Sequence, residues 1–412
     1  MADPASSAGR AQPLPREPLP HDPLPCAGLR VIDLSQGMAG PNCGMQFAAY
    51  GAEVVKIEPP EGDWVRRLGK QYGDQSALSL AVNRGKRSIA LDLKKPAAVE
   101  IVRRLVADAD VLLENNRPGV AERLGLGWKQ MSAINPRLVY VSMTGFGQSG
   151  PYAQRVSTDT IGQAVSGMMS LTRDDEGKPM KIGYLVIDAV ASLYAFQAAT
   201  MALMQRDKTG RGQHVDASLM DAATALIGYK FIETALEGDD PQPLNVPAGN
   251  YRTQDGWLSI TLMREAQFVS ICEVLGLAEV PKDPRFKNFA ARAAHAREIA
   301  AVLAERIATD TTANWLAKME AADVLAAAVY SLSDVVDDRH IKATHRMARY
   351  EQPDIGMLTV PALPGSAPIE SGPRAIAPGT GQQGPDILAQ LGYGAADIER
   401  LIAERVVIAQ QG

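Results

Sequence analysis

The sequence predicts an α/β protein with two domains, a large one built on a mainly parallel sheet and a smaller α+β one. The chain of 412 residues is long enough for this division. Short apolar runs alternate with helix-like segments over the first half of the chain, and this alternation is typical of a parallel sheet covered by helices. After about residue 225 the pattern changes to a hairpin followed by consecutive helices, which indicates the smaller domain.

Residues 1–28 precede the first predicted strand and differ from the rest in composition. Pro-Leu-Pro occurs three times, at 13–15, 18–20 and 23–25. Such a segment favours extended polyproline II and forms no packed core by itself. We expect a Pro-rich arm that is either disordered or laid along a partner subunit.

The large domain is predicted over residues 29–225 and begins with a βαβ unit. An apolar strand, Leu29–Leu34, precedes a helix in which Pro41 suits the first turn and after which Gly51 suits the stop. A second strand follows at Glu53–Glu58. The unit has no GxGxxG, so it carries no dinucleotide fingerprint.

Further strands and helices continue the alternation in the large domain. The predicted strands are Ser88–Leu91, Asp110–Leu113 and Leu138–Ser142, and the predicted helices are Pro96–Ala107 and the Ala/Met/Leu-rich stretch Ala189–Gln205.

The smaller domain is predicted over residues 226–335. A breaker cluster at 239–243 precedes a hairpin, Tyr251–Leu262, with its turn at Asp255-Gly256. Three helices are predicted next, at 265–276, 290–308 and 311–321. Residues 336–412 are interpreted as a linker and a return to the large domain, with strand-like segments at 345–385 and a last helix at about 386–405.

Composition restricts the function. The formal net charge is −5, so no overall positive field attracts nucleic acid or an anionic membrane, and neither is expected as a partner. The three cysteines form no CxxC and the five histidines form no HExxH, which argues against a disulfide framework and against a metal site. No apolar run approaches the roughly 20 residues of a membrane span, and no signal core follows the N-terminus. We therefore expect a cytoplasmic protein.

Two local features could bind a ligand. Residues 36–41 follow the first strand at its carboxyl end, where open α/β sheets bind ligands, but a plain βα turn would look the same. A basic group lies further along, at 84–87 and 94–95 with Arg66, Arg67 and Lys70 upstream. It suits phosphate, although a solvated surface has the same pattern.

Two more features contain polar residues next to apolar runs. Residues 114–119, followed by Arg123, come after a strand and suit either a polar ligand or a simple turn. Asp188 follows an apolar run and precedes an apolar helix. It is interpreted either as a helix N-cap or as a nucleophilic carboxylate that the helix dipole keeps anionic.

In order along the chain, these segments resemble CoA-transferase family III, the CaiB/BaiF type that includes formyl-CoA transferase and carnitine CoA-transferase. The resemblance covers residues 29–408. The matching motifs are AGP at 39–41, GAEVxKxExPxGD at 51–63, NxxKRSIxLDLK at 83–94, ADVxxENxRPG at 109–119, NPRLVYxSxTGFGxxGPY at 135–152, QAxSGxMxxT at 163–172, TGxGQxVDxSLxD at 209–221, YxTxDGWxxI at 251–260 and DPRF at 283–286.

The resemblance implies a large Rossmann-like domain, a smaller domain and an interlocked dimer, with a homodimer favoured and pairing with a homologous subunit as the alternative. It also implies that CoA moves from an acyl-CoA, with succinyl-CoA a candidate donor, to a carboxylic acid. The implied intermediates are an aspartyl anhydride and an aspartyl-CoA thioester. CoA is then a substrate, and neither a prosthetic group nor a metal is required.

The resemblance also assigns residues. Counting from Gln163, the family's nucleophile falls on Asp188, while Asp159 is left with a structural role. The remaining assignments concern CoA: Gln36, Met38 and Ala39 line the pantetheine and thioester end, the backbone of Gly37 to Ala39 stabilises an oxyanion, Leu91 and Lys94 meet the adenosine, and Asn115 and Arg123 contact CoA.

The sequence departs from formyl-CoA transferase in its binding segments. Gln36 replaces a His, Met38 replaces a Gln and Leu68 replaces a Trp, and a glycine-rich loop is shortened to Pro247-Ala248-Gly249. Oxalate is therefore not carried over as the acid, and a bulkier one is expected.

Three alternatives remain. An α-methylacyl-CoA racemase would share the fold but needs a His as a second base. The absence of His between His21 and His214 disfavours it. A CoA-binding subunit of a hetero-oligomeric transferase is the second alternative, and transfer of CoA between two carboxyls of one diacid is the third.

Overall fold

The computed structural model describes residues 24–174, 176–239, 241–243, 245–367, 369 and 372–409. The chain divides into two units, Met1–Ile227 with Arg346–Gly412, and Gly228–His345. The predicted boundary at 335/336 falls inside a helix, α15 (Leu332–Asp337). Residues 1–23 of the predicted arm lie outside the described residues. Cys26, near the end of that arm, is buried and its N–H donates to the Tyr50 carbonyl at 2.8 Å.

A seven-stranded sheet forms the centre of unit 1, with the order β14-β5-β2-β1-β6-β7-β8. All neighbouring pairs are parallel except β14 with β5. The strands are β1 (Arg30–Asp33), β2 (Glu53–Glu58), β5 (Arg87–Leu91), β6 (Val111–Glu114), β7 (Val139–Thr144), β8 (Gln213–Ser218) and β14 (Val407–Ile408). The order reverses next to β1, and such a switch point opens a crevice at the carboxyl ends of the strands.

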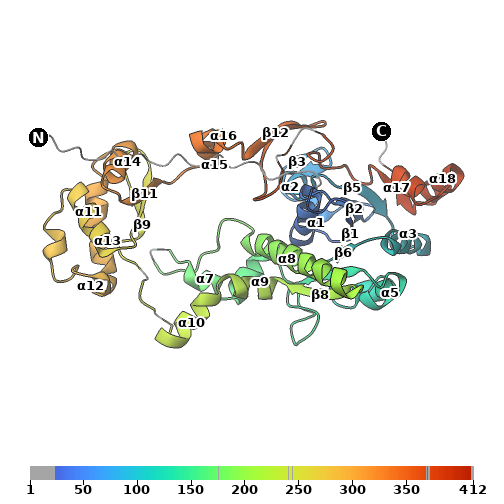
Figure 1. Ribbon diagram of the computed structural model, residues 1–412, viewed down its shortest axis with the longest axis horizontal. Helices are drawn as coiled ribbons and strands as arrows, with labels where there is room; N and C mark the ends of the chain where they lie inside the picture. The colour runs from blue at the N-terminus through green and yellow to red at the C-terminus, as the bar shows by residue number, and fades with distance from the viewer. Residues whose placement is uncertain are drawn as a thin grey trace, which may run out of the picture. The chain divides into compact units, whose positions relative to one another are not determined.

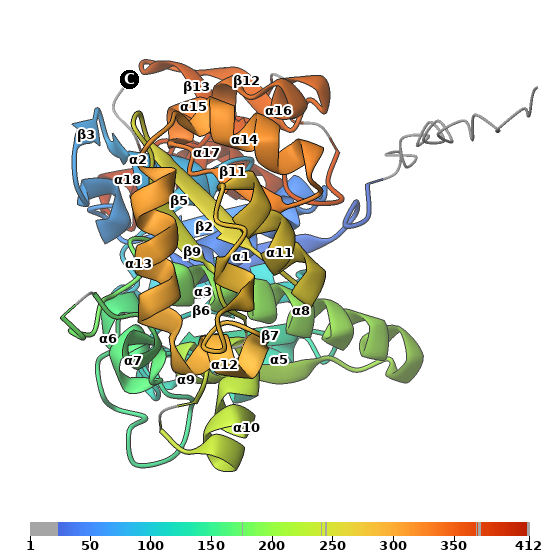
Figure 2. The same ribbon diagram turned by 90° about the vertical axis from the view of Figure 1, so that its left-hand side faces the viewer.

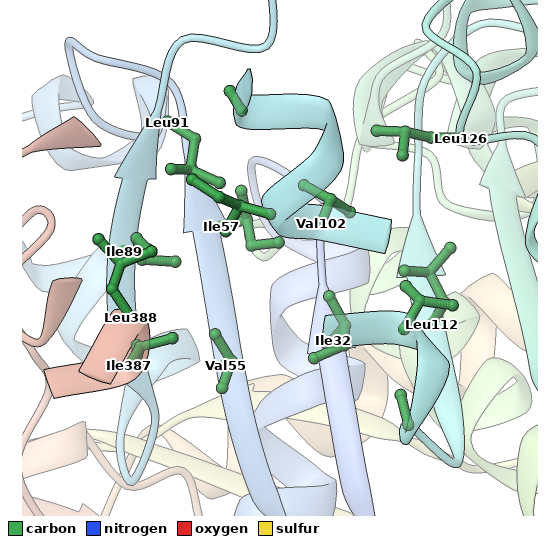
Figure 3. Packing of buried hydrophobic residues seen from close by; sticks show 14 of the residues in the cluster. Ile32, Val55, Ile57, Ile89, Leu91, Val102, Leu112, Leu126, Ile387 and Leu388 are labelled. Atoms are coloured by element: carbon green, nitrogen blue, oxygen red, sulfur yellow. The ribbon is translucent and has the colours of Figure 1, made fainter. Parts of the chain in front are cut away.

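Helices cover both faces of this sheet. Side chains that alternate along each strand enter two different cores, as the period of two in a strand requires. On one face Ile32, Val55 and Ile57 pack against α3 (Pro96–Ala107) and residues near the chain's end (Figure 3). On the other face Val31 and Val54 pack against α1 (Ala39–Ala49) and α8 (Val186–Thr209).

Helix α8 is longer than predicted, because it begins at Val186 and ends at Thr209 rather than spanning 189–205. Its length and composition would suit a membrane span, which corrects the expectation that no apolar run is long enough. However, a stripe of small residues, including Ala195 and Ala199, is fully buried against the sheet and α1. Figure 1 shows α8 in green beside α9 (Leu219–Leu226) and β8.

The remaining elements of unit 1 are short. They are η1 (Trp64–Arg67), β3 (Gln71–Tyr72), β4 (Gln75–Ser76), α2 (Ala77–Asn83), α4 (Val120–Arg123), α5 (Trp128–Ile134), α6 (Asp159–Val165), α7 (Met168–Leu171), β12 (Met347–Gln352), β13 (Gly356–Pro361), α17 (Gly384–Gln390) and α18 (Ala395–Ala403). The single last helix expected at 386–405 is thus two helices, separated at Gly392, whose φ is +85°, a conformation that ends α-helices.

Unit 2 has a three-stranded antiparallel sheet, β11-β10-β9. The predicted hairpin is confirmed as β9 (Gly249–Arg252) and β10 (Trp257–Thr261), to which β11 (Leu325–Ala328) adds. Figure 2 shows helices beside these strands. The helices are α10 (Gly228–Glu237), α11 (Glu265–Val274), η2 (Val280–Lys282), α12 (Phe289–Ala294), α13 (Ala296–Ile307), α14 (Thr312–Ala321), α15 and α16 (Arg339–Ala343). The helix expected at 290–308 is broken at His295.

Candidate active site

A cavity of about 160 Å³ opens at the carboxyl ends of β1, β6, β7 and β8, the place that the strand order indicates. Both the turn before α1 and the start of α8 contribute to it. Its lining residues are Gln36, Met38, Ala39, Trp64, Asn115, Met143, Thr144, Gly145, Ser157, Thr158, Asp188, Ala191, Ala217, Ser218 and Leu219. Five of the predicted site residues therefore meet here, although 152 positions separate Gln36 from Asp188 in sequence (188 − 36).

Asn115 holds the turn after β1 rather than presenting a free amide to the cavity. Its Oδ1 accepts the Gln36 N–H at 2.8 Å, and its Nδ2 donates to the Gln36 carbonyl at 2.6 Å. Because both ends of the amide are engaged by one residue, Asn115 fixes the backbone of the turn between neighbouring strands.

Gly37 is held on its other side by a buried carboxylate. Its N–H donates to Asp63 Oδ1 at 3.0 Å, and Asp63 is also bonded to the buried Lys56 ammonium at 3.0 Å. The Gln36 and Gly37 N–H groups are thus occupied, so they cannot stabilise an oxyanion as predicted for this turn. Ala39 begins α1, where the first N–H groups have no acceptor within the helix.

Asp188 lies in the first turn of α8 and is not its N-cap, a position that belongs to Leu185. The carboxylate that serves this helix end is Asp159, which accepts the Ile187 N–H at 2.7 Å and the Asp188 N–H at 3.3 Å. The helix begins earlier than predicted because its first N–H groups find this acceptor, so the Asp188 side chain is left to face the cavity.

Burial raises the pKa of Asp188 to about 7, and the nearby Asp159 carboxylate adds to this effect. Removing solvent disfavours the charged form, and a like charge disfavours it further. The prediction that the helix dipole keeps Asp188 anionic is thus opposed by these two effects. Asp188 therefore changes its charge near neutral pH. In this range it is more basic than an ordinary carboxylate, and a substantial fraction of it is still ionised.

A second cavity, of about 360 Å³, contains Leu91 and Lys94. Gln36 lines both cavities, so the two share this side chain as a common wall. Arg123 lines neither, although its neighbours Ala121 and Leu124 line the second cavity. Gly37 also lines neither cavity.

Part of the basic group that suited phosphate is internal. Lys86 is buried and its Nζ is 2.7 Å from Asp33 Oδ2, while it also donates to the Pro41 carbonyl at 2.7 Å. Arg66 is buried and paired with Glu58 at 2.7 Å. These cations neutralise carboxylates from β1 and β2, which a linear sequence does not reveal. Of the group, Lys94 lines one of the two cavities described above and the other members line neither.

The cavity beside Asp188 also contains residues that the sequence analysis did not select. Thr144, Ser157, Thr158 and Ser218 contribute hydroxyls, and the half-exposed Trp64 contributes an indole. Thr144 and Ser218 belong to motifs matched at 135–152 and 209–221, so the motifs themselves contained that signal. Of the departures noted above, Gln36 and Met38 line the cavity and Leu68 does not.

Comparison with known proteins identifies the family. The model of CoA-transferase family III matches residues 26–384. A succinyl-CoA–D-citramalate CoA-transferase of Chloroflexus aurantiacus is 32% identical over 92% of this chain and 97% of that protein. A succinate–glutarate CoA-transferase of Agrobacterium fabrum is 34% identical over 89% and 95%. A CAIB/BAIF family protein from Brucella suis has a solved structure with a TM-score of 0.79 and 32% identity, over 89% of this chain and 99% of that one. The chain therefore belongs to CoA-transferase family III.

Proposed function

We propose that this CoA-transferase moves CoA from an acyl-CoA to a carboxylic acid through covalent intermediates on Asp188. The observation that carries the proposal is the cavity, in which Asp188 is the one lining residue with a carboxyl group and which it shares with Gln36, Met38 and Ala39. A carboxylate in such a place can act as a nucleophile. Membership of the family supports the reaction class.

The proposed chemistry begins when a carboxylate oxygen of Asp188 attacks the thioester carbonyl carbon. The C–S bond breaks, CoA leaves as a thiolate, and a mixed anhydride remains. The thiolate then attacks the Asp188 carbonyl carbon, the C–O bond breaks, and the donor acid leaves as a carboxylate. The acceptor carboxylate attacks the resulting aspartyl-CoA thioester, and the same steps in reverse give the new acyl-CoA and free Asp188.

The two cavities suggest how CoA lies. We place its thioester end beside Gln36, Met38 and Ala39, with the Ala39 N–H at the start of α1 directed to the developing oxyanion. The adenosine lies in the second cavity beside Leu91 and Lys94. Gln36 then separates the nucleotide end from the reacting end.

The size of the first cavity supports a short acyl group. A void of about 150 Å³ accommodates a molecule such as benzene, and this cavity measures about 160 Å³. We propose succinyl-CoA as the donor, because two relatives are a succinyl-CoA–D-citramalate CoA-transferase and a succinate–glutarate CoA-transferase. The acceptor is proposed to be an acid larger than oxalate.

We also propose a homodimer of the interlocked kind, with a homologous partner chain as the alternative. Large apolar side chains on α8 and α10, including Met201, Met204 and Phe231, are about half exposed or more, as a surface covered by a second copy would be. A cytoplasmic location is proposed because all three cysteines are free and buried, which suits a reducing compartment.

The proposal is tested by trapping the intermediate. The protein is incubated with a panel of acyl-CoAs, treated with hydroxylamine and digested, and the modified peptide is identified by mass spectrometry. Modification of Asp188 with one donor would name that donor and support the mechanism. Modification at another residue, or full transferase activity in Asp188→Ala, would contradict it.

A matched control and a second assay complete the test. Asp221→Asn removes a carboxylate from the first turn of α9, outside the cavity, and should keep activity and trapping. A racemase would exchange the α-proton of its acyl-CoA with heavy water in the absence of an acceptor acid. Such exchange would favour the racemase alternative, although the cavity lining includes no histidine as second base.

A further inference from the structure

We propose that Asp159 is a positioning residue that favours acylation of Asp188. Its charge repels the Asp188 carboxylate, and this repulsion ends when Asp188 is acylated. The proposal rests on the role of Asp188 put forward above. Before reaction two carboxylates share one buried region. Afterwards Asp188 is a neutral anhydride or thioester, and the negative charge has left on the CoA thiolate or on the released acid.

The geometry fixes Asp159 against the nucleophile. Asp159 is the first residue of α6, is 3% exposed, and its Oδ1 accepts the N–H groups of Ile187 and Asp188. Its Oδ2 accepts Gln163 Nε2 at 2.7 Å. Gln163 is itself held, because its Oε1 accepts the Ile182 N–H at 2.9 Å. Asp159 therefore cannot rotate away from the start of α8 without losing several hydrogen bonds.

These partners stabilise Asp159 without cancelling its charge. All the hydrogen bonds described for Asp159 come from amide groups, and no Lys or Arg pairs with it in the part of the chain that the structure describes. Three other buried carboxylates of unit 1 do have a cation, since Asp33 and Asp63 have lysines and Glu58 has an arginine. Buried Glu114 resembles Asp159, because Asn116 donates two amide hydrogen bonds to it. Among the described residues no cation neutralises the Asp159 carboxylate, so its effect on the neighbouring Asp188 is not cancelled.

Besides burial, Asp159 is the one charged group among the described residues that raises the pKa of Asp188. Helix α1 contains no Asp, Glu, Lys, Arg or His, and its Cys43 faces Asp33 and Lys86. Asp221 on α9 is exposed. On β7 and β8, Tyr140 and His214 pack against each other, and Asp216 accepts the Gln148 N–H. The raised pKa of Asp188 has burial as its first cause and Asp159 as its second.

The repulsion changes with the covalent state of Asp188. While Asp188 is ionised, the Asp159 charge raises its free energy and makes its oxygen more basic and more nucleophilic. When its C–O bond to the acyl carbon forms and the C–S bond breaks, the electron pair departs with sulfur. The repulsion ends at that point. Asp159 therefore favours the acylated forms over the free carboxylate.

The test replaces Asp159 by asparagine, which keeps an oxygen acceptor and removes the charge. Each protein is mixed with succinyl-CoA alone at about pH 8.5, and the fraction carrying CoA on Asp188 is measured by intact mass spectrometry. For Asp159→Asn we expect the acid limb of kcat against pH to move down by about one pH unit. The equilibrium fraction of adduct over free enzyme should fall about tenfold, the change that corresponds to one unit.

Control variants separate the outcomes. Asp221→Asn should change neither quantity. If Asp159→Asn does not fold, Asp159→Ser, which is also uncharged, takes its place. An unmoved acid limb with an unchanged adduct fraction would overturn the inference, because a purely structural cap would lower activity without moving either. Absence of any adduct in the unaltered protein would instead overturn the role of Asp188.

Discussion

At the scale of single residues, Asp188 is placed where ionisation is costly. Its pKa rises from 3.8 to about 7, and each unit corresponds to about 1.4 kcal/mol of differential interaction. The folded protein therefore holds an ionised Asp188 at a cost of a few kcal/mol relative to the unfolded chain. Such destabilisation at a reactive group is typical of active sites.

Asp188→Asn should therefore stabilise the protein while abolishing transfer. The folded pKa is above the unfolded one, so the destabilisation begins above pH 3.8, grows as pH rises, and is complete above about pH 7. The gain in melting temperature should be several degrees at pH 8 and clearly smaller at pH 5. Thermal unfolding of both proteins across this range checks the prediction. An equal gain at both pH values, or a loss at pH 8, would show that Asp188 is not a strained carboxylate.

The residue scale also shows what the sequence could not reveal about the site. The order of the motifs identifies Asp188. Whether its side chain caps the helix or faces the cavity depends on Asp159, which is 29 positions away in the sequence. Lys86 looked like a phosphate ligand because Asp33, its partner, is 53 positions distant. A charge pair between β1 and the residue before β5 depends on the strand order, which local patterns do not contain.

At the scale of elements, the turn between β1 and α1 is held by hydrogen bonds to Asn115 and to Asp63. Gly37 has φ of +83°, which L-residues rarely adopt, and a Cβ there would lie 2.5 Å from Cζ2 of Trp64. Asp63, which binds the Gly37 N–H, also accepts the Val65 N–H and so fixes η1, the element that begins with Trp64. Asp63 therefore links the turn to the segment that contains the Trp64 indole.

Gly37→Ala should displace both the turn and Trp64. The left-handed conformation alone costs roughly 1–2 kcal/mol for a residue with a side chain, and the clash adds a shift of Trp64. We expect a raised KM for acyl-CoA, lower stability and altered indole fluorescence. Gly69→Ala is the matched control, since Gly69 has φ of +78° but open space around its Cβ. If both variants behave alike, backbone strain explains the loss and contact with Trp64 does not matter.

The elements that were predicted correctly are those with strong apolar periodicity. Strands β1, β2, β5, β6 and β7 were all expected, because buried parallel strands read as short apolar runs. Strand β8 was not assigned, since its sequence, QHVDAS, lies at the sheet edge and is mostly polar. The breaks at His295 and Gly392 were also missed, because the apolar pattern continues across both.

At the scale of the whole molecule, the two units differ in how the chain builds them. Unit 1 is discontinuous, and its core combines Ile89 and Leu112 with Leu388, Leu401 and Val407 from the chain's end. Strand β14 completes the sheet by pairing with β5. The large unit therefore cannot be completed until the last residues are present. Unit 2 is formed by one continuous stretch and has a separate core.

A fragment of residues 228–345 should consequently fold by itself. Its core includes Leu258, Phe268 and Ile299, all nearly inaccessible, and Trp315, whose Nε1 donates to the Ile307 carbonyl at 2.8 Å. We expect cooperative thermal unfolding followed by circular dichroism. Trp315→Ala, which costs about 3–5 kcal/mol in a buried site, should abolish that transition in the fragment.

A truncated chain ending at residue 345 should lack a folded unit 1, because Leu388 and Val407 would be missing from its core. A folded large unit in that truncated chain would show that the C-terminal return is dispensable.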